Sequence, residues 1–316
     1  MAEPIASRPD VLVLAGGGTL GEAWMRGLLD GLGAASAIDF RDCEYFVGTS
    51  AGSIVAAVLA AGRAPEAGDG AAERWAKAAT RNGGGAGTAP DPEAEPPAGP
   101  GAFAQAARLG VTAAAPLAPL ALATATPGGA AARAVALNAI PRGKRRMPGL
   151  GRLIDGLGPT FDGRLRIAAV DRRNGRRVIF GAPGSPEASV GEAVLASCAI
   201  PWVFAPVKIG GREYVDGGAW SPTNLDATPV GRGTRVLCLN PTASMQATRA
   251  PLGALRGVAR TAAFTEALAL RARGASVRTI APDDAAATAM GLNLMDRGRV
   301  DGVLEAAYAQ GRALAT

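Results

Sequence analysis

The sequence predicts an α/β fold in which a mainly parallel central sheet carries helices on both faces. Two strand–turn–helix units near the start of the chain support this prediction. Residues 11–15 form a short apolar run that ends in three glycines, and apolar residues then recur at helical spacing over residues 22–32. Residues 45–48 repeat the pattern ahead of a helical stretch over residues 51–61. Short apolar strands that alternate with helices are typical of parallel sheets, because parallel strands need a crossover connection.

The later part of the chain adds further strands and helices to this core. The Asn174-Gly175 pair is a strong hairpin signal between two runs that are rich in β-forming residues. A second hairpin is expected to deliver its last strand directly into Asp216. The patterns predict strands over 164–170, 177–180, 207–215, 234–239 and 276–280, and helices over 190–197, 254–273 and 302–314.

The expected organisation is a single domain over residues 8–316, with a long insertion at about residues 80–150. Residues 82–101 are rich in Gly, Ala and Pro, which predicts a mobile loop without regular structure. Residues 103–139 are rich in Ala and Leu, but Arg and Pro interrupt them before a membrane-spanning length is reached. Two interpretations of the insertion stay open: a lid over the site, or ordinary helices packed on the core.

Composition narrows the choice of partners and compartment. The chain has 33 basic and 27 acidic residues, and the net charge of +6 fits either an anionic surface or a merely arginine-rich composition. The basic residues are scattered, which favours the second interpretation, so no nucleic-acid partner is expected. Three cysteines without a paired motif indicate a reduced compartment. No signal peptide or transmembrane helix is recognised, so a cytoplasmic protein is expected, with peripheral contact to a membrane surface as an option.

A serine in a Gly-x-Ser-x-Gly pattern is the first candidate for chemistry. Ser50 lies between Gly48 and Gly52, after a predicted strand and before a predicted helix. This is the context of a nucleophile elbow, in which a tight turn presents the serine hydroxyl outward. Such serines usually rely on a histidine base, yet the chain contains no histidine. Either the pattern is a coincidence or another residue takes the proton.

The glycine-rich segment from Gly16 to Gly21 allows three interpretations. Successive N–H groups of Gly16, Gly17 and Gly18 ahead of a helix can cradle an oxyanion. The same segment also fits the dinucleotide-binding pattern Gly-x-Gly-x-x-Gly. That pattern expects an acidic residue at the end of a second strand, and residues 38–42 are not a convincing strand end. A simple tight turn is the third interpretation.

Asp216 is the best-placed candidate for the missing base. It ends a predicted strand and is followed by Gly217 and Gly218. An ordinary turn would have the same composition. The functional interpretation gains weight because a nucleophilic Ser50 in a chain without histidine needs a carboxylate or a lysine as its base.

Taken in order, these motifs resemble the patatin-like phospholipases. The resemblance rests on the glycine segment, the Ser50 pattern, Asp216-Gly217-Gly218 and the preceding run of residues 196–207. It covers about residues 10–240 and implies a three-layer α/β/α sandwich. It also implies that Ser50 is the nucleophile, that Asp216 is the proton acceptor, and that the turn of Gly16, Gly17 and Gly18 is the oxyanion hole. Many members of the family carry Arg or Lys just after the glycines, where this chain has Thr19 and Leu20, so backbone groups alone would bind the oxyanion.

The predicted function is therefore a serine hydrolase that cleaves acyl esters of lipids without a cofactor or metal. An acyltransferase that uses the same Ser50–Asp216 dyad would show the same motifs, so the sequence does not distinguish it from a hydrolase. A dinucleotide-binding protein that uses Gly16–Gly21, or a non-enzymatic membrane-surface protein that retains a hydrolase fold, would leave some of the motifs unexplained.

Overall fold

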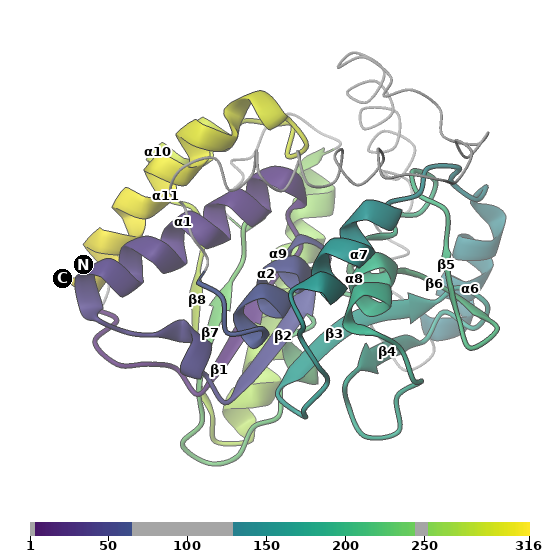
Figure 1. The fold of residues 1–316 in the computed structure, drawn as a ribbon, viewed down its shortest axis with the longest axis horizontal. Coiled ribbons are helices and arrows are strands. Elements are labelled where there is room, and N and C mark those ends of the chain that lie inside the picture. Colours follow the sequence, from purple (N-terminus) through teal and green to yellow (C-terminus); the bar gives the residue numbers. More distant parts are fainter. Residues whose placement is uncertain (1–3, 65–128, 244–251) are drawn as a thin grey trace.

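One eight-stranded sheet organises the protein (Figure 1). The computed structural model describes residues 4–64, 129–243 and 252–316, with side chains described from residue 262 onward in the last range. The strand order is β5-β6-β3-β2-β1-β7-β8, and β4 also pairs with β3. The strands are β1 (Val11–Leu14), β2 (Tyr45–Thr49), β3 (Leu165–Asp171), β4 (Arg177–Phe180), β5 (Val207–Ile209), β6 (Arg212–Asp216), β7 (Arg235–Leu239) and β8 (Ser276–Ile280).

The sheet has a parallel centre and an antiparallel flank. The pairs β3–β2, β2–β1, β1–β7 and β7–β8 are all parallel. Strands β4 and β6 both run antiparallel to β3, and β5 runs antiparallel to β6. The two hairpins expected from the sequence therefore form, and together they make up this flank.

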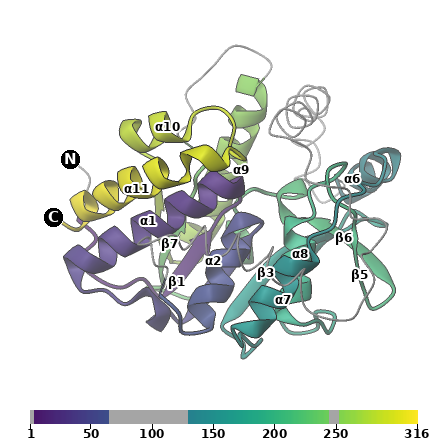
Figure 2. The same cartoon turned by 45° about the horizontal axis from the view of Figure 1, so that its top comes forward.

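Helices cover both faces of the sheet (Figures 1 and 2). Helices α1, α2, α7, α8, α10 and α11 contribute to the core on one face, with α1 alongside α11. Helices α9 and α6 supply buried residues to the opposite face. The described helices are α1 (Gly18–Ser36), α2 (Ala51–Ala60), α6 (Gly129–Ala139), α7 (Pro148–Gly156), α8 (Val190–Cys198), α9 (Leu252–Ala272), α10 (Asp284–Met290) and α11 (Val300–Ala315), with short 3-10 turns η1 (Phe40–Asp42), η3 (Gly217–Ala219), η4 (Leu225–Ala227) and η5 (Arg297–Arg299).

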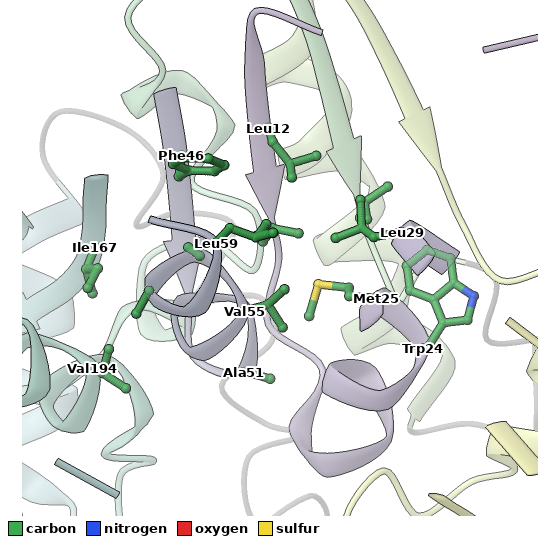
Figure 3. Packing of buried hydrophobic residues seen from close by; sticks show 14 of the residues in the cluster. Leu12, Trp24, Met25, Leu29, Phe46, Ala51, Val55, Leu59, Ile167 and Val194 are labelled. Atoms are coloured by element: carbon green, nitrogen blue, oxygen red, sulfur yellow. The ribbon is translucent and has the colours of Figure 1, made fainter. Parts of the chain in front are cut away.

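Strand alternation explains how one sheet fills two cores. In β1, Leu12 and Leu14 point to one core, whereas Val11 and Val13 point to the other. All four side chains are fully buried, as expected for a parallel strand that is covered on both faces. Figure 3 shows the larger core, where side chains of α1 and α2 pack over β1, β2 and β3.

The predicted three-layer α/β/α sandwich with a mainly parallel sheet is confirmed. The short helix α10 was not predicted, because its seven residues are mostly alanine and give little periodicity. All three cysteines are buried and unpaired, in line with their expected role as core residues. Most of the insertion expected at residues 80–150, including the predicted mobile loop at 82–101, lies outside the described residues. Among the described helices, none combines the length and the apolar character needed to cross a bilayer.

Candidate active site

Ser50 occupies a strained turn between β2 and α2. Its backbone has φ 51° and ψ −123°, a conformation that residues other than glycine rarely adopt. The turn places Ser50 immediately before the first residue of α2, so the positive end of that helix dipole faces the serine. Ser50 therefore has the backbone geometry that the nucleophile-elbow prediction requires.

The two glycines of the motif are required by close packing around this turn. A Cβ atom on Gly48 would lie 2.5 Å from the Cα atom of Ser53. A Cβ atom on Gly52 would collide with the carbonyl oxygen of Leu14 at the end of β1. The helix can start this close to β2 and β1 only because Gly48 and Gly52, respectively, lack a side chain.

Two buried serines hold the elbow in place. The Ser50 N–H donates to the Ser197 hydroxyl oxygen over 2.8 Å, and that hydroxyl in turn donates to the Ala168 carbonyl on β3 over 2.7 Å. The Ser53 hydroxyl donates to the Ser50 carbonyl over 2.6 Å. Both polar backbone groups of Ser50 are therefore engaged, which fixes the direction in which its side chain points.

Asp216 reaches Ser50 because β2 and β6 lie end to end along one edge of β3. Thr49, the last residue of β2, pairs with Ala168, and Asp216, the last residue of β6, pairs with the next residue, Ala169. Strand β4 occupies the other edge at these same two positions. The ends of β2 and β6 therefore meet, and the Ser50 side chain comes close enough to the Asp216 carboxyl group to lower its pKa.

The buried surroundings of Asp216 make its carboxyl group less acidic than that of an exposed aspartate. Its side chain is only 5% exposed, and this burial raises the pKa from 3.8 to about 6. The hydrogen bonds from Ser50 and from the Gly218 N–H, the latter 2.7 Å long, oppose the rise. A pKa near 6 leaves the carboxylate mostly ionised at neutral pH and more basic than an exposed aspartate.

The glycine turn, residues 16–18, lies beside Ser50. A Cβ atom on Gly16 would lie 3.4 Å from the Cβ atom of Ser50. The Gly16 N–H already donates to the Pro222 carbonyl over 2.9 Å. Within the described part of the chain, no hydrogen bond engages the N–H groups of Gly17 and Gly18. The candidate N–H donors of the predicted oxyanion hole are therefore reduced to those of Gly17 and Gly18, whereas the Gly16 N–H anchors the turn.

A C-terminal segment that the sequence did not single out packs on this turn. Gly18 has φ 62°, and a Cβ atom there would lie 2.7 Å from the Met295 sulfur. The neighbouring Leu294 carbonyl accepts the Leu20 N–H over 2.9 Å. Glycine at position 18 thus permits both the left-handed backbone and the close approach of this segment.

The structure brings together every residue that the sequence proposed for the site. Ser197 is the main residue whose contribution was missed. It lies in the run 196–207 that contributed to the family resemblance, but nothing in the sequence shows that its hydroxyl accepts the Ser50 N–H.

Comparisons with known proteins found one matching family. The model of the family described as patatin-like phospholipase matches residues 12–229, a range that contains Ser50, Asp216 and the glycine turn. A search of curated proteins finds no match.

Two solved structures are similar to the chain. VipD from Legionella pneumophila is 16% identical, with a TM-score of 0.43 over 98% of this chain and 67% of VipD. The type III effector protein ExoU is 16% identical, with a TM-score of 0.40 over 99% of this chain and 53% of ExoU. The chain thus spans about half the length of ExoU. Because the family match covers more than half of its sequence, the chain belongs to the patatin-like phospholipase family.

Proposed function

We propose that the protein hydrolyses acyl esters of lipids through a Ser50–Asp216 dyad and a covalent acyl-enzyme. The observation that carries the proposal is that strand register places a serine on a strained elbow next to a buried carboxyl group, in a chain without histidine. Membership of the patatin-like phospholipase family supports a lipid acyl hydrolase over the dinucleotide-binding and non-enzymatic alternatives.

In the acylation step, the Ser50 oxygen attacks the carbonyl carbon of the ester while Asp216 takes the serine proton. The carbonyl oxygen becomes an oxyanion, which the N–H groups of Gly17 and Gly18 stabilise. The N-termini of α1 and α2, at Gly18 and Ala51, add favourable helix dipoles at the same place. The bond to the leaving alcohol then breaks, and that alcohol receives the proton from Asp216.

Deacylation repeats the chemistry with water in place of the serine. Asp216, ionised again, accepts a proton from a water molecule that attacks the acyl carbonyl of Ser50. The tetrahedral intermediate uses the same oxyanion donors, and its collapse returns the proton to the Ser50 oxygen and releases the fatty acid. One carboxylate thus acts twice, as base and then as acid in each half-reaction.

The acceptor of the acyl group distinguishes a hydrolase from an acyltransferase. Both use Ser50 and Asp216, and they differ only in whether water or another alcohol reaches the acyl-enzyme. The proposed substrates are membrane lipids, reached by peripheral contact with a lipid surface. Product analysis with phospholipid vesicles, with and without an added alcohol, separates free fatty acid from a transferred acyl chain.

The test compares Ser50→Ala and Asp216→Asn with the wild type on a p-nitrophenyl ester and on phospholipid vesicles. Each variant is expected to lose activity by at least about 10²- to 10⁴-fold, which is the usual contribution of a general base. Asp171→Asn is the matched control, because Asp171 is another buried aspartate of the same sheet but pairs with Arg212. Wild-type turnover in either test variant would exclude the dyad.

A further inference from the structure

A short irregular segment, residues 221–225, contacts both the glycine turn and strand β2, which ends just before Ser50. The Pro222 carbonyl accepts the Gly16 N–H over 2.9 Å. The next carbonyl, that of Thr223, accepts the hydroxyl of Thr49 over 3.5 Å. Thr49 directly precedes Ser50, the proposed nucleophile. Two consecutive carbonyls of this segment therefore connect the glycine turn to the Ser50 elbow.

Asn224 extends these connections to the base. Its Nδ2 atom lies 3.1 Å from the Thr49 hydroxyl oxygen and 3.3 Å from the Gly217 carbonyl, which follows Asp216. The same amide donates to the Ser221 carbonyl over 2.6 Å. Asn224 is fully buried, so these contacts replace those that water would otherwise make. One side chain therefore bridges the residue before Ser50 and the residue after Asp216.

This segment depends on contacts with its neighbours, because residues 221–224 belong to no helix or strand. Asn224 has φ 48°, in the left-handed region that asparagine adopts more readily than most residues other than glycine. Within the segment, the Ser221 hydroxyl oxygen accepts the N–H groups of Thr223 and Asn224 over 3.3 and 3.1 Å. These local bonds shape the turn, but they do not tie it to a regular element of the fold.

Glu266 of helix α9 supplies that tie. Its Oε2 atom accepts the Thr223 hydroxyl over 2.5 Å and the Leu225 N–H over 2.9 Å. Helix α9 starts at residue 252, beyond the range 12–229 that the family model matches. Glu266 thus supports the segment from a part of the chain that the match does not include, in addition to Arg177 of β4, which donates to the Asn224 side-chain oxygen over 3.3 Å.

We infer that Glu266, through Thr223 and Asn224, is a positioning residue that holds the glycine turn, the Ser50 elbow and the Asp216 loop in register. Glu266 acts through these intermediates and does not touch the reacting atoms. The inference rests on the proposed function for its effect on turnover, but its effect on the order of the site is independent of that function.

The experiment compares two buried threonines. Thr223→Val removes the hydroxyl that donates to Glu266 while it keeps the shape of the side chain. Thr228→Val is the matched control, because the Thr228 hydroxyl is also buried and has no hydrogen-bond partner in the described structure. Thr223→Ser keeps the hydroxyl and is expected to behave like the wild type.

Two quantities are measured for each variant: kcat and KM on a p-nitrophenyl ester, and amide hydrogen exchange over residues 14–21 and 47–53. Thr223→Val is expected to lower kcat by about 10- to 100-fold with little change in KM, because misplaced catalytic groups slow chemistry more than binding. It is also expected to raise exchange in both segments. Thr228→Val should change neither quantity.

A second pair of variants covers the case in which Thr223→Val does not fold. Glu266→Gln retains an oxygen that can accept both bonds and should keep near-wild-type kcat, whereas Glu266→Met has similar length and no such acceptor. Equal kcat and equal exchange in Thr223→Val and Thr228→Val would overturn the inference, as would equal values in the Gln and Met variants. If the wild type hydrolyses no ester, the proposed function fails, and the exchange comparison alone still decides the positioning role.

Discussion

Replacing Asp216 with asparagine is expected to stabilise the folded protein at alkaline pH, although it removes the proposed base. Burial raises the pKa of Asp216 from 3.8 to about 6, so the folded state binds this proton more tightly than the unfolded state does. A raised folded-state pKa gives stability that is fully present below about pH 4 and is lost as the pH rises through 6. The full loss corresponds to about 3 kcal/mol in the free energy of unfolding.

Asparagine resembles the protonated carboxyl group and does not ionise. Its side-chain oxygen can still accept the Gly218 N–H that Asp216 accepts over 2.7 Å. The variant should therefore be more stable than the wild type by about 3 kcal/mol at pH 8 and by roughly half of that at pH 5, where ionisation in the folded state is incomplete.

Urea unfolding of both proteins at pH 5 and pH 8, followed by circular dichroism, measures this difference. Asp171→Asn serves as the reference, because it removes another buried carboxylate of the same sheet, one that forms an ion pair with Arg212. An Asp216→Asn variant that is equally stable or less stable than the wild type at pH 8 would refute the assignment of a buried, costly carboxylate.

Two further predictions concern the same site. The kcat/KM of the wild type should fall tenfold per pH unit below pH 6, reaching about a tenth of its plateau at pH 5, because Asp216 must be ionised to act as base. A pH-rate profile that stays flat from pH 5 to 8 would contradict this prediction. Ser197→Ala leaves the Ser50 N–H and the Ala168 carbonyl without the hydroxyl that joins them. The free energy of unfolding should therefore drop by at least about 2 kcal/mol, and kcat should fall as well. An unchanged urea midpoint and unchanged turnover would show that this bridge is dispensable.

The sequence was sufficient to predict the parallel core and the position of the elbow. Both depend on local signals: a short apolar strand, a glycine turn and a helix that follows within a few residues. The Ser50 elbow also needs small neighbours at Gly48 and Gly52 for steric reasons that act over short distances, so its sequence pattern is informative.

The sequence pattern made Asp216 the best-placed base for Ser50, and the family resemblance supported this pairing, but no local pattern shows that the two residues meet in space. Their meeting depends on the register by which β2 and β6 share one edge of β3, and strand register between distant segments is not encoded in any local pattern. The use of the Gly16 N–H by Pro222 is equally non-local, which is why the expected oxyanion donors included a group that is already hydrogen-bonded.

The contacts of Glu266 could not be predicted from the sequence. They depend on the packing of α9 against the irregular turn around Asn224, and an isolated glutamate in an alanine-rich helix gives no signal of such a contact. Positive φ at Asn224 is likewise a property of the folded backbone, and many asparagines in loops do not share it.

Trapping the acyl-enzyme tests the proposed dyad most directly. The protein is mixed with a p-nitrophenyl ester and quenched in acid within its first turnover, and the acyl group is then located by peptide mass spectrometry. The dyad predicts an acyl adduct on Ser50 in the wild type, none in Ser50→Ala, and formation slowed by about 10²- to 10⁴-fold in Asp216→Asn. An adduct on another residue, or acylation of Ser50 at the wild-type rate in Asp216→Asn, would contradict it.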